Sequence, residues 1–391
     1  MIDKITNIIK YCVGCHACAN ICPKSCIYME SNEGGFLYPK VDYDLCMECN
    51  RCIEVCPINN KAEIDNKPIA FSCINNDEKI RIDSSSGGIF TLIAEKVLSE
   101  GGVVFGAVFD DDFQVEHQYV EKKEELWKLR GSKYVQSKIG DSYKQAKKFL
   151  DNKKKVLFTG TPCQIAGLKS YLGGFYDDLL TIDLICHGVP SPLVWKKYIE
   201  FREKEAGSPV KRIAFRKKNE GWKRFSVSFL FKDNTEYLGN LHNDLYIRAF
   251  LKNVCLRPSC YNCMFKGLNR HSDITLADFW GIQNVLPEMD NDKGTSLVFV
   301  NSRTGKDLFN GIKDRMLYQE VDINEAVKYN SSAIKSAMPN SNRDNFFKDL
   351  KYTSFDKLVK RYCTDQFIIR VKKIIILAFK KIVTKFGFMG K

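Results

Sequence analysis

The feature that most constrains this chain is a cysteine pattern that occurs twice in the first 60 residues. Each copy reads C-x2-C-x2-C-x3-C-P, and the copies lie 34 residues apart. Three evenly spaced thiolates can wrap one corner of an iron–sulfur cube, and in this pattern the fourth cysteine ligates the other cluster. The pattern therefore predicts two [4Fe-4S] clusters. One is held by Cys12, Cys15, Cys18 and Cys56, and the other by Cys46, Cys49, Cys52 and Cys22.

The main alternative to two clusters is a pair of zinc ribbons, which also use C-x2-C spacing. A zinc ribbon needs two such pairs, and it has no use for a third evenly spaced cysteine or for the proline that ends each copy. Residues 1–60 therefore resemble a bacterial-type two-cluster ferredoxin. A ferredoxin carries single electrons, so the rest of the chain must hold the acceptor. Cys26 falls outside the pattern and is expected to be a small buried side chain.

Composition limits what surrounds these cysteines. The chain has 391 residues, 44% of them hydrophobic and 27% charged, so we expect two or three folded domains and exclude a disordered or collagen-like protein. We find neither an apolar run of about 18 residues nor a secretory signal, and we expect a cytoplasmic protein. In a reducing compartment, 16 cysteines are better explained as metal ligands or reactive thiols than as disulfides.

Beyond the cysteine repeat, residues 61–68 are polar and end in a proline, which predicts a linker. Strand-like and helix-like segments then alternate, which predicts an α/β domain over residues 69–330. The Ser/Gly-rich loop of residues 84–88 precedes a helical apolar pattern. Such a loop either presents free N–H groups to a phosphate or serves only as a helix N-cap. Residues 159–164 and 186–188 follow buried strands, so they should lie at the sheet edge where ligands bind.

A second cysteine set occurs in this region. Cys260 and Cys263 form a C-x2-C pair, which is at most half of a metal site. Cys163 and Cys186 stand at two predicted strand ends and would supply the missing thiolates. The alternative is that Cys163 and Cys186 are ordinary buried cysteines.

Five features occur in a fixed order: SSSGG, GSKY, TGTPCQ, a Cys-His-Gly turn, and CYNC followed by DITLADFWG. Over about residues 68–300 they resemble the coenzyme F420 hydrogenase/dehydrogenase beta-subunit family, whose members bind FAD and one [4Fe-4S] cluster beside it. The resemblance implies a third cluster on Cys163, Cys186, Cys260 and Cys263, with Cys255 as a fifth candidate. It also implies FAD contacts from Ser86, Gly87, Gly88, Lys133, Tyr134, Thr161 and Asp278. The expected fold is an α+β ferredoxin-like two-cluster domain followed by an α/β flavin-binding domain.

The resemblance implies an oxidoreductase in which single electrons pass from a ferredoxin or similar donor through the clusters to FAD, which can release two electrons as a hydride. The direction of flow stays open. His187 is a candidate proton donor, or it is a turn residue that holds a carbonyl. The fused ferredoxin departs from F420-reducing subunits, so the acceptor is either a deazaflavin or an unknown organic substrate. The alternatives are an electron-transfer subunit of a larger complex and a protein that keeps its clusters only as folding staples.

Charge is concentrated near the C-terminus. The net charge is +13, and residues 351–391 hold eleven Lys and Arg against two Asp. We expect residues 331–391 to form a helical, basic, amphipathic tail that binds the anionic inner face of the membrane or docks on its own domain. No recognised nucleic-acid module accompanies it, so we expect no nucleic-acid partner. A second basic stretch contains Arg216 and Lys217, and it is either an anion-binding substrate loop or a solvated hairpin edge.

Overall fold

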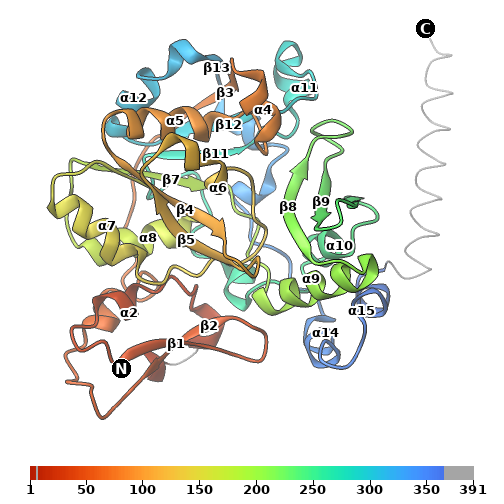
Figure 1. Cartoon of the computed structure of the whole chain (residues 1–391). Helices are drawn as coiled ribbons and strands as arrows, with labels where there is room; N and C mark the ends of the chain where they lie inside the picture. The colour runs from red at the N-terminus through yellow and green to blue at the C-terminus, as the bar shows by residue number, and fades with distance from the viewer. Residues whose placement is uncertain (6–7, 365–391) are drawn as a thin grey trace, which may run out of the picture.

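The computed structural model describes residues 1–5 and 8–364, which form an N-terminal lobe, a central sheet flanked by helices and a second layer with a smaller sheet (Figure 1). In the N-terminal lobe, β1 (Ile27–Ser31) pairs antiparallel with β2 (Leu37–Val41). The other elements of this lobe are η1 (Ile2–Lys4), α1 (Ile8–Tyr11), α2 (Ala17–Ile21) and α3 (Arg51–Glu54). The two cysteine motifs therefore lie before and after one hairpin.

The central sheet has eight strands in the order β13-β3-β12-β11-β7-β6-β4-β5. The four inner strands β11, β7, β6 and β4 are mutually parallel, and the strands on either side join them antiparallel. The strands are β3 (Ile69–Asn75), β4 (Val103–Phe109), β5 (Val115–Val120), β6 (Val156–Thr159), β7 (Leu179–Leu184), β11 (Ile274–Asp278), β12 (Ser296–Val300) and β13 (Met316–Val321). All four parallel strands thus end at the same sheet edge.

Alternate residues of the inner strands are buried on opposite faces of the sheet. On β4, Val104 packs with α5 (Ile89–Ser99), whereas Phe105 packs with α7 (Ser142–Asp151) and α8 (Pro162–Leu172). Cys15 and Ala17 belong to the same buried cluster as α7 and α8, so the N-terminal lobe shares a core with that face. Further helices around the sheet are α4 (Glu78–Asp83), α6 (Leu126–Leu129), α11 (Ile282–Val285), α12 (Arg303–Asn310) and α13 (Ile323–Val327). Short 3-10 helices join these elements, namely η2 (Lys123–Glu125), η3 (Pro258–Asn262), η4 (Pro287–Met289), η5 (Lys313–Arg315) and η6 (Ser331–Ala333).

A second core lies beside the sheet, with Trp195, Tyr198 and Tyr246 fully buried at its centre. Its elements are α9 (Pro192–Ala206), the antiparallel strands β8 (Val210–Lys217), β9 (Ser226–Phe231) and β10 (Glu236–Asn240), and the helices α10 (Leu245–Leu251), α14 (Arg343–Asp349) and α15 (Phe355–Tyr362). Because Phe346 and Leu358 are buried in this core, the start of the expected tail packs against the domain.

The amphipathic part of the expected tail, from residue 366, lies outside the described residues. Within residues 1–5 and 8–364, no helix is both long and apolar enough to cross a membrane.

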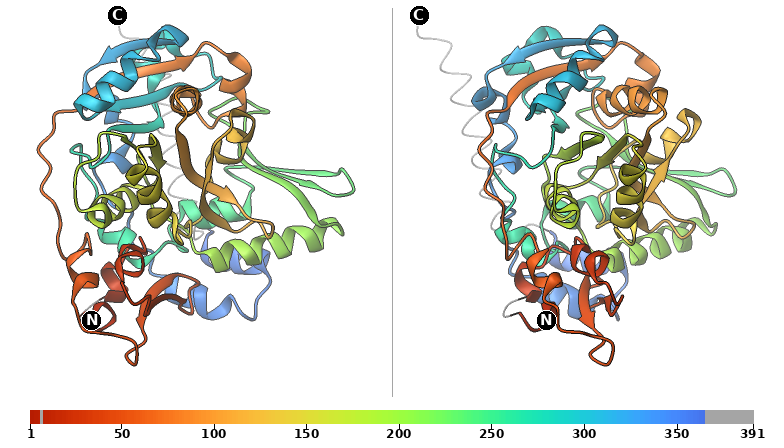
Figure 2. Two further views of the ribbon diagram at one scale, coloured as in Figure 1. Left: turned by 60° about the vertical axis from the view of Figure 1, so that its left-hand side comes forward. Right: turned by 90° about the vertical axis from the view of Figure 1, so that its left-hand side faces the viewer.

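The predicted linker, residues 61–68, runs along the outside of the molecule from the N-terminal lobe to β3 (Figure 2). Three hydrogen bonds fix its course. The Nδ2 atom of Asn269 donates to Ile64 O, and the Nδ2 atom of Asn66 donates to Arg270 O, each at 2.9 Å. The backbone N–H of Arg270 donates back to Asn66 Oδ1 at 3.2 Å. The linker is therefore tethered to the segment that follows the C-x2-C pair.

Candidate cofactor pockets

The structure gathers the eight cysteines of the repeat into two pockets, and the grouping is the crossed one predicted. The inner cysteine pocket is lined by Cys12, Cys15, Cys18 and Cys56. The outer cysteine pocket is lined by Cys22, Cys46, Cys49 and Cys52. None of the sixteen cysteines, all within the described part of the chain, forms a disulfide.

Both cysteine loops bend in the same way. Gly14 and Glu48, which are equivalent positions of the two copies, have φ of 67° and 54°. The next equivalent pair, His16 and Asn50, has φ of 62° and 59° and begins α2 and α3. Left-handed backbone at these positions turns each loop back on itself. The repeat in the sequence thus becomes a repeat in backbone shape.

The donor sets fit multi-iron clusters. In the described part of the chain, no group of three or more His, Cys, Asp or Glu side chains converges closely enough for one metal ion. A single tetrahedral zinc would need thiolates about 2.3 Å from one point. Four cysteines of the repeat line each space, which is the number of thiolates that one [4Fe-4S] cluster takes.

Cys26 is buried as expected, but it also lines the outer cysteine pocket. Its sulfur lies 3.3 Å from that of Cys22, and burial raises the pKa of the Cys26 thiol to about 12. The spacing of the repeat gave no sign of this contact.

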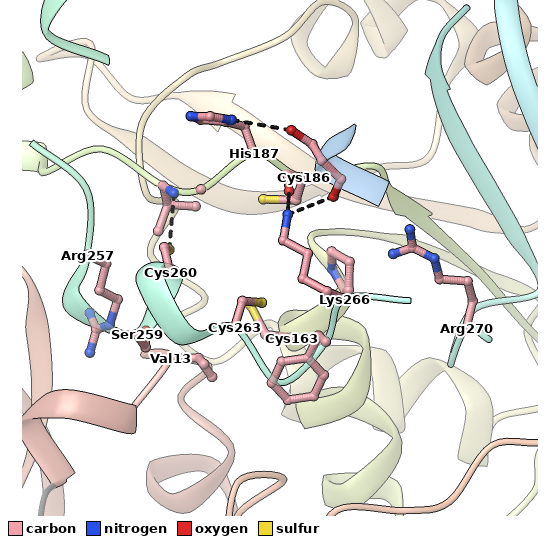
Figure 3. A pocket seen from close by; sticks show the side chains of 15 residues that line it. Val13, Cys163, Cys186, His187, Arg257, Ser259, Cys260, Cys263, Lys266 and Arg270 are labelled. Atoms are coloured by element: carbon pink, nitrogen blue, oxygen red, sulfur yellow. Dashed lines mark hydrogen bonds between the residues drawn. The ribbon is translucent and has the colours of Figure 1, made fainter. Parts of the chain in front are cut away.

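A third cysteine pocket joins residues far apart in the sequence (Figure 3). Its sulfurs come from the first turn of α8, the turn after β7, and the 3-10 helix η3 and its end, and they belong to Cys163, Cys186, Cys260 and Cys263. Burial raises the pKa of Cys186 to about 11 and that of Cys260 to about 12, so a metal cluster bound there would have to displace the thiol protons. Cys255 is fully buried in the second core and does not line this pocket, so it is not the fifth ligand candidate that the sequence allowed.

A larger pocket of about 1360 Å³ of empty space, part of it open to solvent, lies at the carboxyl ends of β6, β7 and β11. Its size suits a cofactor or small-molecule ligand. Six of the seven predicted FAD contacts line it: Ser86, Gly88, Lys133, Tyr134, Thr161 and Asp278. The structure therefore brings together residues that are up to 192 positions apart.

Gly87, the seventh predicted contact, has a packing role. Its N–H donates to Ser296 Oγ at 2.9 Å, and a Cβ atom there would lie 2.5 Å from Cys73 O. The next residue, Gly88, begins α5 with φ of 84° and no side-chain cap. The loop can therefore lie close to β3 and β12 while the uncapped end of α5 is left for a ligand.

The GSKY turn also lines the large pocket. Ser132 donates to Ser85 Oγ through its backbone N–H at 2.7 Å and its hydroxyl at 2.9 Å. Burial lowers the pKa of Lys133 to about 7. This turn and the serine loop are thus joined directly by hydrogen bonds.

Arg216 and Lys217 do not form the anion-binding pair considered from the sequence, because Arg216 pairs inward with Asp278 and Lys217 pairs at the surface with Glu236. Arg216 is buried and forms a bidentate pair with Asp278 at 2.7 and 3.1 Å, and it donates to Tyr134 Oη at 3.0 Å. Burial opposes the Arg216 charge, but Asp278 outweighs it, so the pKa of Arg216 is raised. Lys217 instead pairs with Glu236 at the surface.

His187 lies in the third cysteine pocket and does not line the large pocket, which corrects its proposed role as a proton donor there. Its ring contacts Asn253 Oδ1 at 2.6 Å and Ser332 Oγ at 3.3 Å, so it fixes a turn. The histidine that lines the large pocket is His117, which the sequence did not single out. Burial lowers its pKa to about 4, and its nitrogens contact Ser137 Oγ at 2.6 Å and Thr159 O at 2.9 Å.

Family models match the chain in three consecutive parts. They are the 4Fe-4S dicluster domain at residues 11–60, and the N-terminal and C-terminal parts of the coenzyme F420 hydrogenase/dehydrogenase beta subunit at residues 70–142 and 153–326. The chain belongs to the coenzyme F420 hydrogenase/dehydrogenase beta-subunit family. The predicted family is therefore confirmed, as is a mixed α/β fold with an N-terminal ferredoxin-type domain.

Relatives of this beta-subunit family member include the coenzyme F420-dependent sulfite reductase of Methanocaldococcus jannaschii, 28% identical over 203 residues. That match covers 50% of this chain but only 31% of the reductase. An uncharacterized protein of the same organism is 24% identical over 76% of this chain and 85% of its own length. A chain of the F420-reducing [NiFe] hydrogenase complex from Methanosarcina barkeri is 19% identical, with a TM-score of 0.45, over 76% of this chain and 92% of that chain.

Proposed function

We propose that this protein is an iron–sulfur flavoprotein oxidoreductase that passes single electrons from a ferredoxin-type donor through three [4Fe-4S] clusters to FAD and a two-electron acceptor. The observation that best supports this proposal is that neighbouring pockets share lining residues. Val13 lines both the inner and the third cysteine pockets, and Val189 lines both the third and the large pockets. At the second junction, Thr161 Oγ1 lies 3.1 Å from Cys163 Sγ. The inner cysteine pocket, the third cysteine pocket and the large pocket thus form one series, and the outer pocket lies in the same lobe as the inner one.

Exposure supports electron entry at the outer cysteine pocket. Among the twelve proposed ligands, Cys49 alone is exposed, and the others are buried or half-buried. Leu45 and Met47 beside it are each 58% exposed, which offers a protein donor an apolar contact. Electrons would then pass inward to the cysteines that pack against α8.

The residues of the large pocket would hold and orient FAD, which when bound converts between one-electron and two-electron transfer. Ser86, Gly88 and the uncapped start of α5 suit the anionic pyrophosphate. Lys133 and Tyr134 would lie near the flavin, and the Arg216–Asp278 pair, which also bonds Tyr134, stiffens that side of the pocket. The names of two relatives favour a deazaflavin of the F420 type as the acceptor.

A second candidate is an electron-transfer module without a substrate of its own. It is favoured by the match to 31% of a larger reductase, in which the remaining length belongs to other parts of that enzyme. Turnover separates the two functions. The first predicts that the isolated chain reduces a deazaflavin or another two-electron acceptor with dithionite, and the second predicts no turnover without a partner.

The decisive experiment is anaerobic purification of the full chain with iron, sulfide and flavin quantified. We expect about twelve irons and one FAD per chain. Replacing Cys263 with alanine should remove about four irons, while Cys255→Ala, the matched control from the second core, should remove none. Eight irons without flavin in the wild-type protein would contradict the proposal.

A further inference from the structure

The Arg257 side chain lies between the inner and the third cysteine pockets. Arg257 lines the third pocket, beside Val13 and Ser259 (Figure 3). Its guanidinium reaches into the N-terminal lobe, where Nε donates to Cys12 O at 2.7 Å and Nη2 donates to Leu37 O at 2.9 Å. The same Nη2 lies 3.5 Å from Cys12 Sγ. One side chain therefore contacts a proposed ligand of one cluster and lines the pocket of another.

This guanidinium is fully buried, with an exposed fraction of 0%. Its remaining hydrogen bond goes from Nη1 to Gln136 Oε1 at 3.0 Å, and its carbon lies 4.2 Å from the centre of the Tyr38 ring. All its oxygen partners are neutral. Within residues 1–5 and 8–364, no carboxylate forms an ion pair with it.

A buried charge without a counter-charge is costly, because burial removes its hydration. Neutral carbonyls and an aromatic face compensate only part of that cost. The groups near Arg257 that become negative when a cluster assembles are cysteine thiolates. Cys12 is in direct contact, and Cys260 is three residues along the chain, with its N–H donating to Arg257 O at 3.0 Å.

We propose that Arg257 is the shared counter-cation of the inner and third clusters, and that it raises the reduction potential of both. The proposal rests on the proposed function, since it requires a cluster in the third cysteine pocket. Reduction adds one electron to a cluster and breaks no bond, so the reduced form carries one more negative charge. A cation in contact favours that form, and net charge and hydrogen bonds to sulfur are known determinants of cluster potential.

The contacts also make Arg257 a positioning residue. Its guanidinium holds the Cys12 and Leu37 backbones, while its own backbone N–H donates to Val189 O at 3.0 Å. Val189 lines both the third and the large pockets. The arginine thus fixes the N-terminal lobe to the turn that separates the third cluster site from the large pocket.

The test is a redox titration of the reconstituted full chain, followed by electron paramagnetic resonance, with Cys263→Ala used to assign the third-cluster signal. We expect Arg257→Gln to lower the reduction equilibrium constant of the inner and third clusters at least tenfold, which is about 59 mV for one electron. The outer cluster should change less than threefold. Arg202→Gln removes a guanidinium that stacks on Tyr198, Phe201 and Tyr237 away from the cysteine pockets, so it should shift no cluster.

Arg257→Lys retains the charge and provides a second test if Arg257→Gln fails to assemble. It should keep both constants within threefold of wild type. Unchanged potentials in Arg257→Gln, an equal shift of all three clusters, or a tenfold loss in Arg257→Lys would overturn the inference. The iron and flavin contents of the wild-type protein test the proposed function separately, so the proposed function and the role of Arg257 can each fail without the other.

Discussion

Replacing Gly167 with alanine probes how the N-terminal lobe is seated on α8. A Cβ atom at Gly167 would lie 2.9 Å from both Cβ and Sγ of Cys15, and 3.1 Å from the hydroxyl oxygen of Tyr143. Carbon contacts are normally about 3.5–4.0 Å, so the lobe must move by about 0.5 Å or more. Overpacking of this kind costs about 1–3 kcal/mol, whereas alanine gains about 1 kcal/mol over glycine inside a helix. The steric cost is the larger of the two, so we expect the free energy of unfolding to decrease by about 1 kcal/mol.

The assay is thermal unfolding of the anaerobic full chain, with iron counted before and after heating. A loss of about 1 kcal/mol should lower the midpoint of this 391-residue chain by about 1 °C. The larger Gly167→Val should also lose the inner cluster, about four irons per chain. Gly174→Ala is the control, because a Cβ atom there meets nothing within 4 Å. A Gly167→Ala protein that is as stable as wild type, with its iron intact, would refute the proposed seating.

Two further predictions concern buried polar groups of the large pocket. Asp278→Asn should destabilise the chain by about 3 kcal/mol, because it leaves the buried Arg216 guanidinium without its anion, and urea unfolding at pH 7 would show this. An unchanged midpoint would contradict the ion-pair argument. Burial lowers the pKa of His117 to about 4, against about 6.5 in the unfolded chain. The contribution of the neutral, buried ring to the stability of the folded protein is therefore complete above pH 6.5 and is lost as the pH falls toward 4. As the pH falls from 6.5 to 4, the unfolding free energy of wild type should therefore decrease by about 3 kcal/mol more than that of His117→Gln. Parallel curves of unfolding free energy against pH for the two proteins would refute this.

The cysteine spacing predicted the grouping of the repeat because the constraint is local. Each motif is a single loop, and equivalent residues 34 positions apart adopt the same left-handed backbone. The third cysteine pocket needed the family resemblance, since Cys163 and Cys260 are nearly 100 residues apart and only the sheet topology brings them together. Alternation of strands and helices indicated the α/β domain and the edge where the pockets lie.

The sequence alone could not predict which way individual side chains point or which residues meet across long distances in the chain. His187 follows a strand end, as a site residue would, but its ring turns toward Asn253. Arg216 belongs to a basic stretch that suggests a solvated surface, yet the pleat of β8 points it inward to Asp278. Arg257 has no motif around it, and its role depends on a fold that places Cys12 within reach across 245 positions. Such residues can be found only once the two lobes are placed together.

Helix α8 explains how the inner and third cysteine pockets keep a fixed relation to each other. Cys163, in its first turn, lines the third cysteine pocket, and Gly167, four residues later, contacts Cys15 of the inner pocket. Residues four apart lie on the same helix face with a rise of about 6 Å. Both pockets are therefore held by one rigid helix, and the linker of residues 61–68 does not set their distance. Lengthening that linker should leave transfer between them unchanged, whereas any side chain at Gly167 should slow it.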